Sequence, residues 1–144
     1  MTVLFSPLGL SYGVLYSAIL LVRPARLVVI TSPQAIGNLH SAIDAARFFH
    51  STFEVETHML DDHLAGFKEG RTLARLLSSS ADTTNVVNMT GGTTVMQDCV
   101  RSLADNLRTQ NKHVREVAVI DRREPEVQKR SPLVVGELIE IPAP

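Results

Sequence analysis

The sequence has a single cysteine, almost no net charge and no long apolar run. One cysteine cannot form a disulfide within the chain, and Cys99 falls on the apolar stripe of an expected helix, which predicts a structural thiol in a reducing cytoplasm. The formal net charge of −1 gives no overall attraction to duplex nucleic acid or to an anionic membrane. No secretory signal is present, and residues 14–22 are too few to cross a bilayer. We expect a cytoplasmic protein without duplex nucleic acid as a partner.

Signatures of common cofactors and metals are also missing. Neither a Walker A pattern nor the G-x-G-x-x-G fingerprint is present, which argues against ATP hydrolysis and ordinary NAD binding. The five histidines lack metal-ligand spacing; His58 and His63 flank a pair of aspartates, but this pattern alone is a weak metal signal. We therefore expect no metal and no cofactor.

One short motif matches a sequence pattern of serine hydrolases. Residues 9–13 read G-x-S-x-G, the nucleophile elbow of serine hydrolases. The elbow normally follows a central strand of a larger domain, with an acid and then a histidine later in the chain. Here Ser11 follows the first strand, and no histidine follows Asp121. We interpret the match as accidental and expect Ser11 to cap the first helix.

The chain has the length and apolar content of one domain, with 144 residues of which 44% are hydrophobic, so we expect a single domain over residues 1–144. Apolar periodicity predicts strands at residues 2–6, 26–31, 53–57, 84–89, 114–120 and 133–141. It predicts helices at residues 14–21, from Ser32-Pro33 to about residue 50, and from a cap at Asp61 or Asp62 to about residue 77. A fourth helix is expected over residues 95–107. Residues 121–131 are expected to form a charged loop.

The alternation of strands and helices predicts an α/β fold. We expect a Rossmann-like, open, mostly parallel sheet with helices on both faces, plus an antiparallel C-terminal edge strand. Ligands in such sheets bind at the carboxyl ends of the strands, where the strand order reverses. This placement gathers residues 6–11, 31–34 and 88–94 into one neighbourhood, although they are far apart in the sequence.

Two adjacent glycines join the fourth strand to the fourth helix. Gly91 and Gly92 lie where the first amides of a helix lack hydrogen-bond partners and the helix dipole is positive. Both the free N–H donors and the positive potential favour binding of an anion. Thr90, Thr93 and Thr94 add hydroxyl donors around them. A set of uncharged donors suits phosphodiesters, each of which carries one negative charge.

The segment Asn-x-Thr-Gly-Gly-Thr at residues 88–93, together with Ser-Pro-Leu-Gly-Leu-Ser-Tyr-Gly at residues 6–13, resembles the CRISPR-associated Rossmann fold (CARF) domains. Members of that family dimerise and bind cyclic oligoadenylates, the second messengers of type III CRISPR systems. The resemblance implies a homodimer with cyclic oligoadenylate as its ligand, and with these ligand-binding residues: Ser6, Pro7, Leu8, Gly9, Ser11, Thr31, Ser32, Gln34, Asn88, Thr90, Gly91, Gly92, Thr93 and Thr94.

We consider three functions, of which the first two follow from this resemblance. The first is a sensor that regulates an effector domain, which could be attached outside this chain, as could a membrane segment. The second is a metal-independent ring nuclease, with Ser11 and Thr94 as its catalytic positions. Many relatives carry lysine where this chain has Thr94, so we expect cleavage to be slow or absent unless Arg122 or Arg123 supplies the cation. The third is an accessory protein that only dimerises or docks on a partner.

Overall fold

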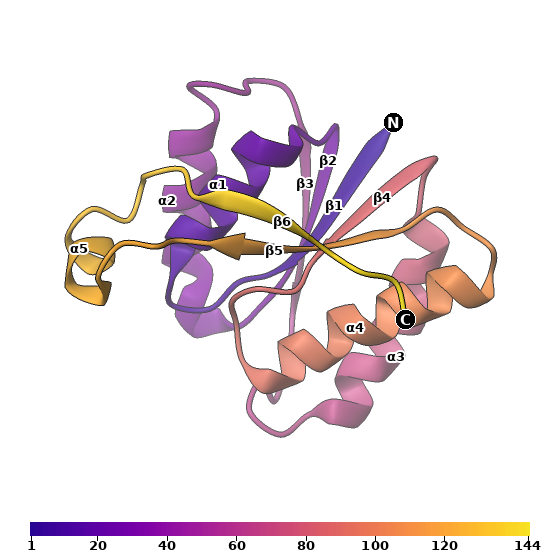
Figure 1. The fold of residues 1–144 in the computed structure, drawn as a ribbon. Coiled ribbons are helices and arrows are strands. Elements are labelled where there is room, and N and C mark those ends of the chain that lie inside the picture. The colour runs from indigo at the N-terminus through magenta and orange to yellow at the C-terminus, as the bar shows by residue number, and fades with distance from the viewer.

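The computed structural model describes all 144 residues, and its six strands form one sheet in the order β3-β2-β1-β4-β5-β6 (Figure 1). Neighbouring strands are parallel except β5 and β6, which are antiparallel. The strands are β1 (Thr2–Pro7), β2 (Arg26–Thr31), β3 (Glu54–Met59), β4 (Thr84–Asn88), β5 (Arg115–Ile120) and β6 (Glu137–Ile141). This is the Rossmann-like α/β fold predicted from the sequence, with the antiparallel strand at the C-terminal edge.

Helices cover both faces of the sheet. Helices α1 (Tyr12–Val22) and α2 (Ile36–Ala46) pack on one face, and α3 (Phe67–Leu77) and α4 (Thr94–Thr109) pack on the other (Figure 1). The two hydrophobic cores are of similar size, with 16 and 15 buried residues. Sequence patterning explains this, because Leu27 and Val29 of β2 face one core while Val28 and Ile30 face the other.

The structure corrects several local predictions. Residues 121–131 were expected to be a loop, but they contain the short helix α5 (Pro125–Arg130). Helix α3 begins at Phe67 and not after Asp61 or Asp62, because Asp62 Oδ1 accepts hydrogen bonds from the amides of Leu64 and Ala65 and so stabilises a turn.

The second helix is also divided at its start. A 3₁₀ turn, η1 (Pro33–Ala35), precedes α2, which ends at Ala46, several residues before the expected end. A second 3₁₀ turn, η2 (Ser78–Ser80), follows α3 directly. No helix combines the length and the hydropathy that a membrane span requires.

Candidate functional site

The strand order reverses between β1 and β4, at the centre of the sheet. These strands are adjacent, with Phe5 beside Val87, but β1 leads into α1 on one face and β4 leads into α4 on the other. The loops that follow them, residues 8–11 and 89–93, therefore lead to opposite faces from the carboxyl edge of the sheet, where folds of this class bind ligands.

The two loops touch through their backbones. A Cβ atom at Gly9 would lie 3.0 Å from the Cα of Gly92, so a larger residue at Gly9 would push the loops apart. Gly91 and Gly92 have φ angles of +94° and +74°, in the left-handed region that glycine adopts without strain. The sequence thus places glycine where both the close approach and the backbone conformation require it.

Asn88 fixes the shape of the second loop from inside. Its side chain is fully buried; Oδ1 accepts from the Thr90 amide at 3.0 Å, and Nδ2 donates to Ser6 Oγ at 3.0 Å and to the Thr90 carbonyl at 3.2 Å. The hydroxyl of Ser6, also buried, donates to the Pro7 carbonyl at 2.9 Å. Asn88 and Ser6 therefore connect the ends of β1 and β4, and their side chains face the protein interior.

The end of β2 supports the first loop in the same way. Thr31 is buried and its Oγ1 donates to the Leu8 carbonyl at 2.8 Å, while the Leu8 amide donates to the Ile30 carbonyl at 2.9 Å. Ser32 is buried beside it, and Gln34 on η1 is exposed. Of the predicted residues on this segment, Gln34 alone presents its side chain to solvent.

Three consecutive backbone amides in the second loop are free. The N–H groups of Gly91, Gly92 and Thr93 have no hydrogen-bond partner in the protein, and all three residues are partly exposed. They stand at the start of α4, which is 16 residues long and is capped by Thr93, whose Oγ1 accepts from the Met96 amide at 3.3 Å. Free donors at the positive end of a helix dipole form a site for an anion.

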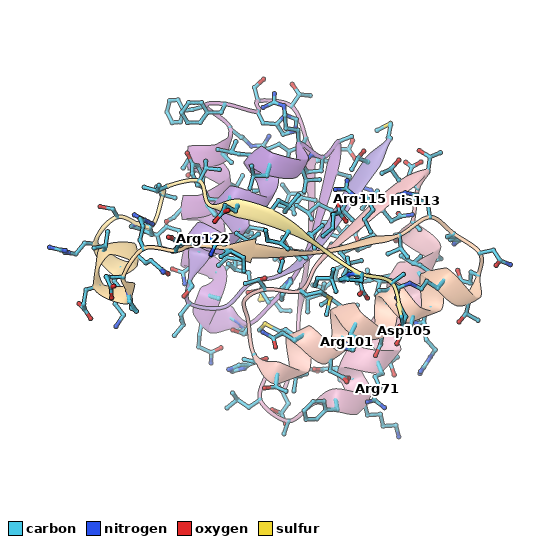
Figure 2. The ribbon with its side chains drawn as sticks, viewed as in Figure 1. Arg71, Arg101, Asp105, His113, Arg115 and Arg122 are labelled. Atoms are coloured by element: carbon cyan, nitrogen blue, oxygen red, sulfur yellow. The ribbon has the colours of Figure 1, made fainter.

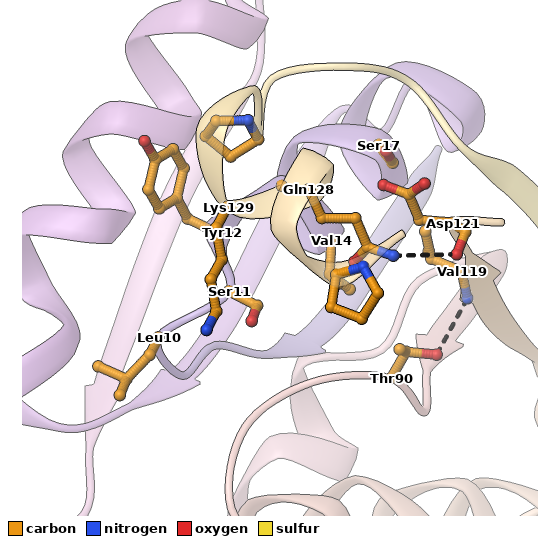
Figure 3. Close-up of a pocket in the computed structure, with 13 residues that line it drawn as sticks. Leu10, Ser11, Tyr12, Val14, Ser17, Thr90, Val119, Asp121, Gln128 and Lys129 are labelled. Carbon is orange, nitrogen blue, oxygen red and sulfur yellow. Dashed lines mark hydrogen bonds between the residues drawn. The ribbon is translucent and has the colours of Figure 1, made fainter. Parts of the chain in front are cut away.

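A cavity of about 440 Å³ opens beside these loops (Figure 3). Ser11 and Thr90 are the predicted site residues that line it. Pro7, Leu8, Gly9 and the residues from Gly91 to Thr94 belong to the adjoining loops and do not line the cavity itself. The full lining is Leu10, Ser11, Tyr12, Gly13, Val14, Ser17, Thr90, Val119, Asp121, Pro125, Gln128, Lys129 and Pro132.

Ser11 presents a free hydroxyl to this cavity. It is the N-cap residue of α1, as predicted, but its side chain makes no capping hydrogen bond and is exposed. Thr90, on the opposite side, accepts from the Val119 amide at 3.0 Å, which ties the glycine loop to β5 (Figure 3). Tyr12 is half-buried at the cavity wall.

The β5–α5 segment supplies a wall that the sequence did not predict. Asp121, Pro125, Gln128 and Lys129 of this segment all line the cavity. A helix signal was present, because Pro125 occupies the first turn and basic residues follow in the last turn. The placement of this helix over the cavity has no signal in the local sequence.

The arginines expected to supply a cation are engaged elsewhere. Arg123 pairs with Asp121 at 2.8 Å and holds the pKa of that carboxyl below its ordinary value, chiefly through its hydrogen bonds. Arg122 pairs with Glu137 of β6 and lies over the β5–β6 edge (Figure 2). Neither arginine lines the cavity, whereas Lys129 does and makes no ion pair.

The histidines do not gather into a metal site. His58 bonds to Glu56 at 2.7 Å, and no group of three histidine, cysteine or acidic side chains is placed to hold a metal ion.

Comparison with known proteins shows that this chain has the same fold as a solved structure. No protein family matches this sequence, and no curated protein matches it either. Among solved structures, the chain is similar to Can2 from Sulfobacillus thermosulfidooxidans in complex with cyclic tetra-adenylate, with a TM-score of 0.65 and 13% sequence identity. The match covers 83% of this chain and 32% of Can2, so this chain spans about a third of that protein's length. At this identity, the likeness establishes the Rossmann-like fold.

Proposed function

We propose that this chain is a CARF-like sensor domain over residues 1–144 that binds cyclic oligoadenylate in type III CRISPR antiviral signalling. The observation that carries this proposal is the run of three free amides, at Gly91, Gly92 and Thr93, beside the reversal of strand order. The motif at residues 88–93 resembles that of CARF domains, and the similarly folded Can2 is known in complex with cyclic tetra-adenylate. Both observations support the same ligand class.

The chemistry of the loops fits a phosphodiester. Residues 6–13 and 88–96 contain no charged side chain, so the two loops offer only amides, hydroxyls and neutral surface. A phosphodiester carries a single negative charge, which neutral donors at a helix start can satisfy without a dedicated cation. Ser11 and Thr90 would contact sugar or phosphate, and Tyr12 would pack against a base.

We propose a homodimer with cyclic tetra-adenylate as the preferred ring, because a ring with two-fold symmetry matches two identical loop sets. Apolar side chains near the cavity support a covering partner: Leu10 is 78% exposed at its edge, and Leu133, Val134 and Val135 are exposed just after Pro132. A change in the dimer on binding would bias an attached or partner effector, in proportion to the ligand's preference for one dimer state.

Isothermal titration calorimetry with cyclic tetra-adenylate tests this proposal. We expect saturable binding at one ring per dimer and little binding of linear tetra-adenylate. Ser11→Ala should weaken binding by about threefold to tenfold through loss of one hydrogen bond, whereas Ser41→Ala, on the exposed side of α2, should not. Absence of saturable heat with both cyclic tetra-adenylate and cyclic hexa-adenylate would contradict the proposal. Light scattering coupled to size exclusion measures the dimer independently.

A ring nuclease is the second candidate, favoured by the unbonded hydroxyl of Ser11 in the cavity. In that reaction a ribose 2′-hydroxyl attacks the adjacent phosphorus, the P–O5′ bond breaks, and the proton passes to the leaving 5′-oxygen, which gives a 2′,3′-cyclic phosphate. The protein would position the sugar and stabilise the developing charge. Thr94 is exposed and brings no cation to this step. Chromatography of labelled ligand after long incubation separates the two functions, since an intact ring excludes cleavage.

A further inference from the structure

The cavity contains one unpaired charge. Two of its lining residues are charged, Asp121 and Lys129, and the carboxylate of Asp121 is paired with Arg123. Lys129 lines the cavity without an ion-pair or hydrogen-bond partner, and its side chain extends toward Ser11 (Figure 3). The unpaired ammonium of Lys129 and the hydroxyl of Ser11 can therefore both bind an anion that enters the cavity.

The segment that carries Lys129 is exposed and is held by hydrogen bonds. Within α5, Gln128 Nε2 donates to the carbonyls of Asp121 and Arg123, at 3.2 and 2.7 Å. At the far end, Ser17 Oγ donates to the Val134 carbonyl at 3.3 Å. No residue between positions 121 and 136 is buried, and α5 projects beyond the edge of the sheet (Figure 1). No residue of α5 belongs to a hydrophobic core, so its position depends on these hydrogen bonds and on the contact of the Pro132 backbone with Gly13, which lets α5 shift against the cavity.

We infer that α5 is a flap over the nucleotide site and that Lys129 is its phosphate-binding residue, supplying from the side the cation that the glycine loop lacks. The inference rests on the proposed function. Contact between the Lys129 ammonium and a phosphodiester of the ligand closes α5 over the cavity and orders residues 121–131. The positive charge thus comes from α5, while the amides that receive the phosphate belong to the loop that leads into α4.

The test compares neighbouring positive charges on the same helix. Lys129→Met removes the ammonium but keeps an extended side chain, and it should weaken cyclic tetra-adenylate binding about tenfold in calorimetry. Arg130→Met makes the same change in net charge one residue away; Arg130 does not line the cavity, so affinity should stay within about twofold. Lys129→Arg should retain most of the affinity. Both positions are exposed, and melting temperatures verify that the variants fold.

Hydrogen–deuterium exchange gives a second readout. Ligand should slow exchange at residues 121–131 of the unaltered chain, and this protection should be largely lost in Lys129→Met. Equal affinities for Lys129→Met and the unaltered chain, equal losses at positions 129 and 130, or no change in exchange at residues 121–131 would each overturn the flap while leaving the proposed function intact. A lack of binding by the unaltered chain would overturn both.

Discussion

Gly92 lies directly against Met96, a buried residue in the first turn of α4. A Cβ atom at Gly92 would lie 2.8 Å from Met96 Sδ, 3.2 Å from Met96 Cβ and 3.0 Å from Pro7 Cβ. The thioether could move, but the two Cβ atoms belong to stiff parts of the structure. The φ angle of +74° adds a conformational cost for any other residue.

Gly92→Ala should therefore lower the free energy of unfolding by about 1–3 kcal/mol. Gly37→Ala is the matched control, because Gly37 lies in α2 and a methyl group added there would have nothing within 4 Å, so alanine should stabilise by about 0.5–1 kcal/mol. Chemical denaturation measures both. Equal stabilities for the two variants would mean that Gly92 has room for a side chain.

Asn88→Ala should destabilise the fold and weaken ligand binding together. The substitution removes three hydrogen bonds of a fully buried amide and leaves the Thr90 backbone without its partners, which costs about 1–3 kcal/mol. Asn106→Ala, on the partly exposed side of α4, should change stability by less than about 0.5 kcal/mol. Thermal unfolding and calorimetry with cyclic tetra-adenylate report the two effects. Unchanged affinity in a folded Asn88→Ala variant would show that the loop does not depend on this amide.

The Cys99 thiol should be unreactive in the folded protein. Burial, with a smaller effect from Asp98, raises its pKa from the ordinary 9.0 to about 12, so almost no thiolate forms at neutral or mildly alkaline pH. The neutral thiol is favoured in the folded state, so its contribution to stability is complete below pH 9.0 and is lost as the pH rises toward 12. Titration with a disulfide reagent should show no reaction until guanidinium chloride unfolds the chain. Rapid labelling of the native protein would contradict this burial.

Asp121→Asn should strengthen binding of an anionic ligand. The substitution removes the acidic charge from the cavity lining and frees Arg123, while the amide oxygen of asparagine can still accept from the Arg123 backbone. Because Arg123 lowers the pKa of Asp121, acidification within the range of a binding assay would not remove this charge, so substitution is required. We expect about twofold to fivefold higher affinity for cyclic tetra-adenylate. Calorimetry measures the change.

Asp105→Asn is the control for that experiment. Asp105 is exposed on α4, far from α5, and its charge should not affect the ligand (Figure 2). An equal gain in affinity for the two variants would point to a general effect of net charge and not to the cavity.

Sequence patterns predicted those features that local physics controls. The β-branched run of β2 predicted a strand buried on both faces, and Gly91 and Gly92 predicted the junction between β4 and α4. The apolar spacing from Val95 to Leu107 predicted α4, which extends to Thr109. Each of these features depends on neighbours in the chain, so a single sequence contains the information.

The sequence did not show the direction of the polar side chains. Asn88, Ser6 and Thr31 are residue types that suit a ligand, but in the structure they are buried and hold the loops. Nothing local distinguishes a polar side chain that bonds to a neighbouring strand from one that faces solvent. The partners are separated by as many as 82 positions, and the sheet brings them together.

By itself, then, the sequence determined the order of the elements, the class of the fold and the loop that offers free amides, because propensity, periodicity and glycine conformation act over a few residues. Only the tertiary structure decided which side chains reach the cavity and that Lys129 lines it. The reason is physical, because α5 buries none of its residues and so has no apolar face that fixes its position. Its position depends instead on hydrogen bonds to the end of β5 and on the antiparallel pairing of β6 with β5.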